Sequence, residues 1–135
     1  MAGNRYVLDL GRVEVMADVR LNGVELGVQW KPPFRVDVTR ALQSGRNRLE
    51  VKVTNLWPNR MIGDEQFSDD CTAGGTWKTG PIPAWPEWFR QHQPRPEPRR
   101  LTFTTWKYYT AKSPLLASGL IGPVTLQMMR RLVIK

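Results

Sequence analysis

The chain has 135 residues, a length that fits one domain with a single hydrophobic core and is too short for two well-buried cores. Hydrophobic residues make up 41% and charged residues 24%, and no apolar run approaches the roughly 20 residues of a membrane span, so we expect a globular chain without a transmembrane helix. The net charge is +8, and nearly all the excess lies after residue 80, where nine Lys or Arg stand against two Asp or Glu. No recognition helix or RNA-binding motif accompanies this charge, so nucleic acid is not the expected partner.

Cys71 and His92 are the single cysteine and the single histidine of the chain. One cysteine excludes an internal disulfide, and one Cys with one His cannot supply the four ligands of a usual zinc site. We therefore expect no cofactor. A short acidic stretch leaves calcium as the one weak metal candidate, because calcium prefers several oxygen ligands from a loop; it comprises Asp64, Glu65, Asp69 and Asp70.

The first half of the chain alternates apolar and polar residues in the manner of β-strands. After a first strand in "YVLDL", residues 6–10, the stretch "VEVMADVRL", residues 13–21, predicts one strand with Val13, Val15, Ala17, Val19 and Leu21 on one face. Asn22-Gly23 follows at once and suits a type I′ turn, which predicts a hairpin whose return strand runs from Val24 towards Trp30. Pro32 and Pro33 then interrupt the pattern.

The later strands follow the same alternation. "FRVDV", residues 34–38, precedes "TRALQSG", which predicts one helical turn with Thr39 as N-cap and Gly45 beyond its end. "NRLEVKVTN" (47–55), "LTFTTWKYY" (101–109) and "GPVTLQMMRRLVI" (122–134) supply the remaining strands. About seven short strands and no long amphipathic helix predict an all-β fold, a single antiparallel β-sandwich of the jelly-roll type over residues 1–135.

Residues 56–100 form the exception, a long irregular connection rich in Trp and Pro. A connection of this length is normally functional or disordered, and its aromatic content argues against simple disorder. We expect it to cross one end of the sandwich, packed by its own Trp residues. Trp30 and Trp106, on or beside predicted strands, are expected in the core.

Carbohydrate binding suits this composition, because a sugar ring stacks its C–H face on an aromatic side chain while polar side chains meet its hydroxyls. The aromatic candidates are Trp77, Trp85, Trp88 and Tyr109, and the polar candidates are Asn59, Arg60 and Asp64. Each Trp could instead only pin the long loop, and Arg60 could simply pair with Asp64 or Glu65. The carboxylates of residues 64–70 also leave open a small glycoside hydrolase, which needs two carboxyl groups.

The order of these segments resembles the galactose-binding-like β-sandwiches attached to glycoside hydrolases. The shared elements are the Asn-Gly hairpin, the Pro-Phe entry to "VDVT" and the Gly-x-Asn-x-Leu-x-Val strand. The continuation "TNLWPNRMIGDE" and the ending "SPLLASGLIGPVTL" are most similar to the C-terminal sandwich of the large bacterial α-L-rhamnosidases that degrade plant polysaccharides. The resemblance covers about residues 6–126.

This resemblance implies a non-catalytic accessory module, since catalysis in the family belongs to another domain. It also implies rhamnose-containing plant polysaccharide as ligand, a catalytic domain as partner, and a periplasmic or extracellular parent enzyme. The family enzymes are far longer and carry strands before "YVLDLG", so we expect a fragment or truncated homologue whose open sheet edge could pair with a second copy. A structural domain that only docks on a catalytic partner is the remaining alternative. The first five residues carry no signal-peptide pattern, and localisation stays open.

Overall fold

The computed structural model describes residues 4–68, 84–104 and 108–130. The chain falls into two compact units, which are considered separately. The sandwich unit comprises Met1–Leu56 and Ala117–Lys135, and the insert unit comprises Trp57–Leu116. None of the helices in the described ranges is both long and apolar enough to cross a membrane.

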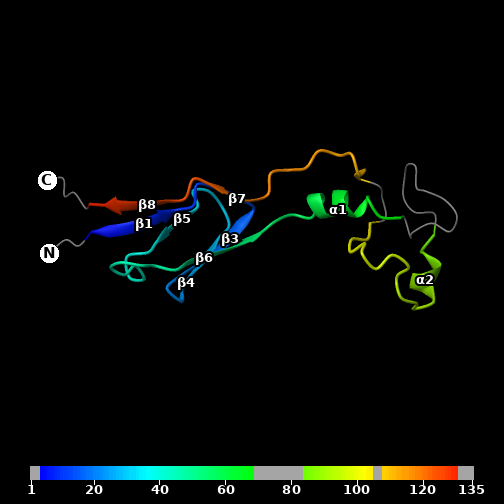
Figure 1. Ribbon diagram of the computed structural model, residues 1–135, viewed down its shortest axis with the longest axis horizontal. Helices are drawn as coiled ribbons and strands as arrows, with labels where there is room; N and C mark the ends of the chain where they lie inside the picture. Colours follow the sequence, from blue (N-terminus) through cyan, green and yellow to red (C-terminus); the bar gives the residue numbers. More distant parts are fainter. Residues whose placement is uncertain (1–3, 69–83, 105–107, 131–135) are drawn as a thin grey trace. The chain divides into compact units, whose positions relative to one another are not determined.

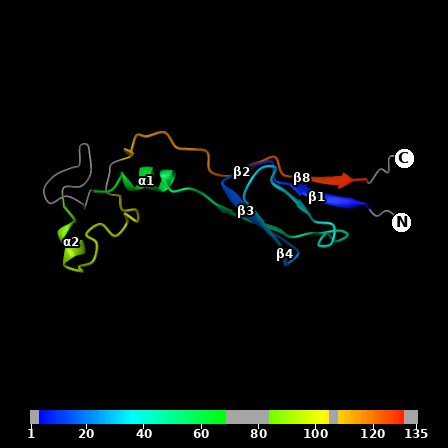
Figure 2. The same cartoon turned by 180° about the vertical axis from the view of Figure 1, so that it is seen from behind.

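The sandwich unit contains all the strands of the described residues (Figure 1). They are β1 (Arg5–Asp9), β2 (Arg12–Glu14), β3 (Met16–Leu21), β4 (Val24–Gln29), β5 (Arg35–Asp37), β6 (Leu49–Thr54), β7 (Gly119–Gly122) and β8 (Thr125–Met129). They form two three-stranded antiparallel sheets, in the orders β5-β1-β8 and β4-β3-β6, and a separate β2-β7 pair. Figures 1 and 2 show β1 and β8 side by side. In the register of this pair Leu8 lies opposite Leu126. The predicted all-β antiparallel sandwich is confirmed.

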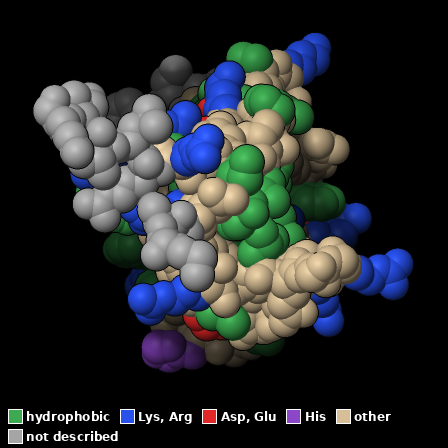
Figure 3. All heavy atoms as spheres, turned by 90° about the vertical axis from the view of Figure 1, so that its left-hand side faces the viewer, with side chains coloured by type: hydrophobic (Ala, Val, Ile, Leu, Met, Phe, Trp, Pro, Cys, Tyr) green, Lys and Arg blue, Asp and Glu red, His purple; other side chains and the backbone are tan. Residues whose placement is uncertain are grey.

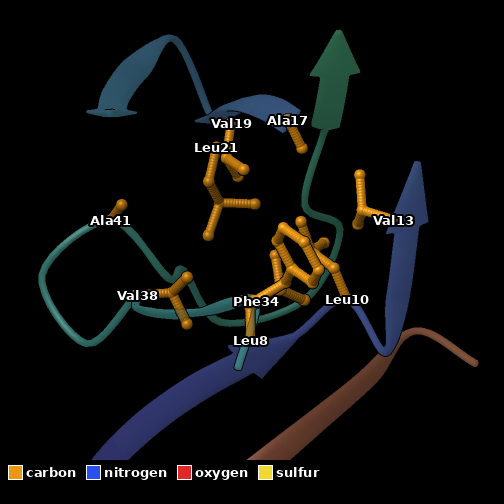
Figure 4. Close-up of a cluster of buried hydrophobic side chains, with 9 residues drawn as sticks. All are labelled: Leu8, Leu10, Val13, Ala17, Val19, Leu21, Phe34, Val38 and Ala41. Carbon is orange, nitrogen blue, oxygen red and sulfur yellow. The ribbon is translucent and has the colours of Figure 1, made fainter. Parts of the chain in front are cut away.

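The core lies between the two three-stranded sheets. Leu8 comes from β1, while Val19 and Leu21 come from β3, and Figure 4 shows these side chains pointing into the same space. Leu10, Val13, Ala17, Phe34, Val38 and Ala41 complete the buried cluster. The inner face of β8 is less covered, because Leu126 and Met128 are 52% and 65% exposed although they lie opposite Leu8 and Tyr6.

The predicted Asn-Gly hairpin is confirmed. Asn22 and Gly23 have φ values of 53° and 82°, as a type I′ turn requires, and β3 pairs with β4 on either side of them. The single strand predicted over residues 13–21 is wrong. It divides at Val15 into β2 and β3, which join different partners, β7 and β6, so the alternating pattern continues while the hydrogen-bonding partner changes.

The predicted cap at Thr39 is also wrong. The backbone does turn here, since the N–H groups of Ala41 and Leu42 both donate to the Val38 carbonyl oxygen. However, Asp37 Oδ1 accepts the Thr39 N–H at 2.9 Å, and the Thr39 hydroxyl accepts the Tyr6 N–H at 2.8 Å. The Thr39 hydroxyl therefore ties the turn to β1 instead of capping a helix.

Two short helices belong to the insert unit, α1 (Pro58–Asp64) and α2 (Glu87–Arg90). Pro58 suits the first turn of α1, where a missing N–H breaks no helical hydrogen bond. The strand predicted over residues 101–109 is not present in its described parts, 101–104 and 108–109. The backbone N–H groups of Leu101 and Thr102 bond to a side chain of α1, which replaces the ladder partner that a strand would need.

Candidate functional site

Asn59 links the two ends of the insert unit. Its side-chain amide nitrogen donates to the Leu116 carbonyl oxygen at 2.8 Å, and its side-chain oxygen accepts the Leu116 N–H at 2.9 Å. The amide therefore pairs with Leu116 as a neighbouring strand would. Both hydrogen-bonding groups of this predicted sugar-binding side chain make internal contacts.

Asp64 is the polar centre of the insert unit, and its side chain is fully buried. Its Oδ2 accepts hydrogen bonds from the Leu101 N–H at 2.9 Å, the Thr102 N–H at 2.7 Å and the Thr102 hydroxyl at 2.9 Å. These donors are 37 and 38 residues away in the sequence. A single carboxylate thus fixes the chain after Arg100 against α1.

Arg60 lies one helical turn before Asp64 and forms an ion pair with it. Its Nη2 is 2.8 Å from Asp64 Oδ1, and the same nitrogen donates to the Arg99 carbonyl oxygen at 2.9 Å. Oδ1 receives no well-aligned hydrogen bond, so the contact is mainly electrostatic. Burial raises the pKa of Asp64, but the hydrogen bonds from Thr102 and Leu101, together with the Arg60 charge, outweigh it and lower the pKa.

Two further Arg–Glu pairs surround this centre. Arg100 is buried, pairs with Glu65 and donates to the Asp64 carbonyl oxygen at 2.9 Å. Arg99 donates to Glu97 through two nitrogens at 2.9 Å, which lowers the pKa of Glu97 to about 2. Guanidinium groups therefore neutralise these carboxylates.

The acidic stretch was the candidate for calcium. Within the described residues no group of three or more His, Cys, Asp or Glu side chains could hold a metal ion. Asp64 and Glu65 both face arginines, as given above, while Asp69 and Asp70 lie outside the described residues.

Four aromatic side chains gather beside α2. Trp85 stacks on Phe89 with ring centroids 5.2 Å apart and on Phe103 at 5.8 Å, while Trp88 meets Phe89 and Phe103 edge to face. Arg95 lies over the Trp88 ring at 5.8 Å. Trp85 and Phe89 are each 53% exposed, so the cluster presents ring surface to solvent. We call Trp85, Trp88, Phe89 and Phe103 the aromatic platform.

The remaining aromatic predictions have different outcomes. Tyr109 lines a hollow of about 10 Å³ with Tyr108, Glu65, Arg100 and other residues, and this is room for one water molecule and not for a sugar ring. Trp77 and Trp106 lie outside the described residues. Trp30, expected in the core, is 65% exposed with Lys31 against its ring, so that prediction is wrong.

Phe89, Phe103 and Arg95 contribute to the aromatic platform although they were not among the residues predicted for a ligand site. The spacing in "AWPEWF" was the available signal, because a short helix started after Pro86 brings Trp85 and Phe89 to the same side. Phe103 carries no such local signal, since it reaches the platform only through the fold of the insert unit.

Neither Asp64 nor Glu97 has the environment of a glycosidase acid. Such an acid needs a raised pKa so that it keeps its proton until it reaches the leaving group. The pKa values of Asp64 and Glu97 are instead lowered, and Asp64 has no exposed surface. The exposed aromatic surface of the platform is better suited to non-covalent binding of a ligand with an apolar face.

Comparison with known proteins relates this chain to glycoside hydrolases. No protein-family model matches it. It is 46% identical over 129 residues to a curated protein of Formosa agariphila named "Putative beta-glucuronidase", a match that covers 95% of this chain and 11% of that protein. It also resembles the structure of a rhamnosidase from Novosphingobium sp. PP1Y, with 36% identity and a TM-score of 0.62, over 93% of this chain and 9% of that one. The chain thus spans about a tenth of the length of these relatives.

Proposed function

We propose that this chain is a non-catalytic, carbohydrate-binding accessory module of a larger glycoside hydrolase, similar to the C-terminal galactose-binding-like sandwich of an α-L-rhamnosidase. Two relatives that carry glycosidase names support this context. Nearly the whole chain matches each of them, but it accounts for only about a tenth of their length. Such proportions fit one module of a large enzyme, and we propose that residues 1–135 form a single domain in which the insert unit is a long insertion into the sandwich unit.

The observation that carries the binding proposal is the exposed stack of Trp85 on Phe89. The two rings are 5.2 Å apart with 26° between their planes, and more than half of each side chain is exposed. A near-parallel, solvent-facing pair offers a surface on which the C–H face of a sugar can lie. Trp88 packs edge to face against Phe89 and Phe103, with Arg95 over its ring, and so supports the stacked pair.

Fewer polar side chains are available for sugar contact than the sequence alone suggested. Asp64 is fully buried and Asn59 is paired with Leu116, so direct sugar contact by either would require these bonds to open. Arg60 is partly exposed and can contact a ligand at the edge of α1. The aromatic platform is therefore the set to test first, and Arg60 and Tyr109 remain as further candidates from the sequence.

Docking on a catalytic domain is the second candidate, and it rests on the sandwich unit. Leu126 and Met128 lie on the inner side of β8 and are more than half exposed. β8 pairs with β1 on one side, and its other edge has no strand partner among the described residues. An unpaired edge beside an uncovered apolar face suits a neighbouring domain or a second copy of the chain.

The experiment that tests the proposed function is affinity gel electrophoresis of the full chain in gels containing single polysaccharides. The panel includes a rhamnose-containing pectic polysaccharide, the ligand proposed from the rhamnosidase resemblance, and a rhamnose-free glucan. We expect retardation in the pectic gel. The same preparation should not hydrolyse an aryl α-L-rhamnoside. Lack of retention in every gel would contradict carbohydrate binding, and turnover of the rhamnoside would favour the small-enzyme alternative.

A further inference from the structure

A second hollow lies in the sandwich unit, and none of its lining residues belongs to the aromatic platform. Its volume is about 560 Å³, within the usual range of small-ligand sites. It is lined by Arg5, Val24, Leu26, Asp37, Thr39, Arg40 and Ala41. Figure 3, which views the molecule from the left-hand side of Figure 1, shows hydrophobic side chains gathered near the centre of that face, with Lys and Arg side chains around its margin.

The floor of this hollow is apolar. Val24 and Leu26 come from β4, directly after the type I′ turn, and Ala41 comes from the turn that follows β5. Val24 is half exposed, although it lies opposite the buried Leu21 across the β3-β4 pair. An aliphatic surface is therefore open to solvent where β4 meets the turn that follows β5.

The rim of the hollow carries one ion pair, Arg5–Asp37, and one arginine without a carboxylate partner among the described residues, Arg40. Arg5 and Asp37 are paired, with Nε and Nη2 of Arg5 at 3.0 and 2.5 Å from Asp37 Oδ2. The other oxygen of Asp37 accepts the Thr39 N–H, so this carboxylate is fixed in position. Hydrogen bonds from Thr39 and Arg5 also lower the pKa of Asp37, which keeps it ionised and able to accept a hydroxyl hydrogen bond.

Arg40 differs from three other arginines of the sandwich unit. No carboxylate of the described residues lies within ion-pair distance of its guanidinium, whereas Arg5, Arg35 and Arg48 all have such partners. The guanidinium group is planar and binds carboxylates through two parallel hydrogen bonds. An unpaired Arg at the edge of an apolar floor therefore favours a ligand with one carboxylate and one apolar face.

We propose that this hollow binds a uronic acid unit of an acidic glycan. The sugar carboxylate pairs with Arg40, the C–H face of the ring lies on Val24 and Leu26, and a ring hydroxyl donates to Asp37. The volume accommodates one or two sugar rings, and the net charge of +8 favours approach of an acidic polymer. This site goes beyond the proposed function, because it lies in the other unit and requires none of the platform residues.

The test is an amide-resolved NMR titration of the full chain with methyl α-D-galactopyranosiduronic acid. Methyl α-D-galactopyranoside, in which a hydroxymethyl group replaces the carboxylate, is the matched neutral probe, and sodium sulfate is the simple-anion probe. We expect the uronide to shift the signals of Val24, Leu26 and Ala41 and to bind at least about tenfold more tightly than either control, because it alone offers both the charge and the apolar ring face.

Two variants locate the interaction. Arg40→Gln should weaken uronide binding about tenfold or more, whereas Arg46→Gln, which removes an exposed Arg a few residues further along the same loop, should leave it unchanged. The spectrum of each variant without ligand shows whether it has folded like the wild type. Equal binding of the neutral galactoside, equal binding of sulfate, the same loss in both variants, or no shifts with the uronide would each overturn the proposal.

The uronide titration and the affinity-gel test of the proposed function can fail independently of each other. Trp85→Ala should leave the uronide-induced shifts at Val24 and Leu26 intact even where it weakens retention by pectic polysaccharide. Loss of those shifts in Trp85→Ala with a wild-type-like unliganded spectrum would place uronide binding on the aromatic platform and contradict the assignment to the sandwich unit.

Discussion

Replacing Asp64 with alanine should remove the polar centre of the insert unit. The change leaves the Leu101 N–H, the Thr102 N–H and the Thr102 hydroxyl without their acceptor, and it deprives Arg60 of its ion-pair partner. The Arg60 side chain is 44% exposed, so most of the cost comes from the three donors left without an acceptor, at about 1–3 kcal/mol each with overlap, and we expect a total of about 3–5 kcal/mol. A unit of roughly 60 residues has a total stability of about 3–9 kcal/mol, so the loss is comparable to the whole.

Urea unfolding followed by tryptophan fluorescence measures this effect. Five of the six tryptophans, Trp57, Trp77, Trp85, Trp88 and Trp106, belong to the insert unit, so the signal reports mainly on it. With a denaturant dependence of about 1–3 kcal/mol per molar urea, the Asp64→Ala midpoint should fall by at least about 1 M, or the variant should already be unfolded in buffer. Asp64→Asn, which keeps one oxygen acceptor, should lose about 2 kcal/mol.

Glu87→Gln is the matched control, because Glu87 is an exposed acidic residue of the same unit whose side-chain oxygen accepts a hydrogen bond from Gln91, which the amide oxygen of glutamine can also accept. Its free energy of unfolding should stay within about 0.5 kcal/mol of the wild-type value. If Asp64→Ala also stays within that range, the buried carboxylate does not hold the insert unit together and the reasoning is refuted.

Three further predictions follow from individual contacts. Asn59→Ala should lower the stability of the insert unit by about 1–3 kcal/mol, because both backbone groups of Leu116 lose their partner; an unchanged fluorescence midpoint would contradict this. Gly11→Ala should destabilise the sandwich unit by about 2–4 kcal/mol in circular-dichroism melts, since a Cβ would lie 2.5 Å from the Gly122 carbonyl carbon at a φ of 66°. Gly23 also has a positive φ but open space around it, so Gly23→Ala should cost only about 1 kcal/mol. Glu97 has a pKa of about 2 in the folded protein against an ordinary 4.5, so its stabilising contribution is complete above pH 4.5 and disappears as the pH falls towards about 2. The melting temperature of Glu97→Gln should therefore fall less steeply over that pH window than the melting temperature of the wild type. Identical slopes would count against the Arg99–Glu97 pair.

The sandwich could be predicted from the sequence because its signals are local. Alternation places Leu8, Ala17, Val19 and Leu21 in the core, and Asn22-Gly23 specifies the turn through the conformations of two residues. Alternation does not say which strand pairs with which, so the division at Val15 between partners β7 and β6 was missed. Trp30 was misplaced for a related reason, since hydrophobicity near a strand end does not show whether another element covers the residue.

The insert unit could not be predicted in the same way, because its contacts join distant parts of the chain. Asp64 meets Thr102, Arg100 meets Glu65, and Asn59 meets Leu116, each across 35 or more residues with no periodic pattern between them. The sequence marked Asn59, Arg60 and Asp64 as polar residues of interest but left open whether they face a ligand or one another. In the structure Arg60 pairs with Asp64, which is the internal alternative that the spacing had allowed.

The central claim is that the exposed rings of the aromatic platform bind carbohydrate, and the most direct measurement compares two tryptophan variants in the pectic affinity gel. Trp85→Ala removes one ring of the stacked pair, from a residue that is 53% exposed, whereas Trp30→Ala removes the ring of a residue of the sandwich unit that is 65% exposed. Stacking of one sugar contributes about 1 kcal/mol or more, so Trp85→Ala should weaken retention at least about fivefold while Trp30→Ala migrates like the wild type. Equal retention of the wild type and both variants would contradict the account.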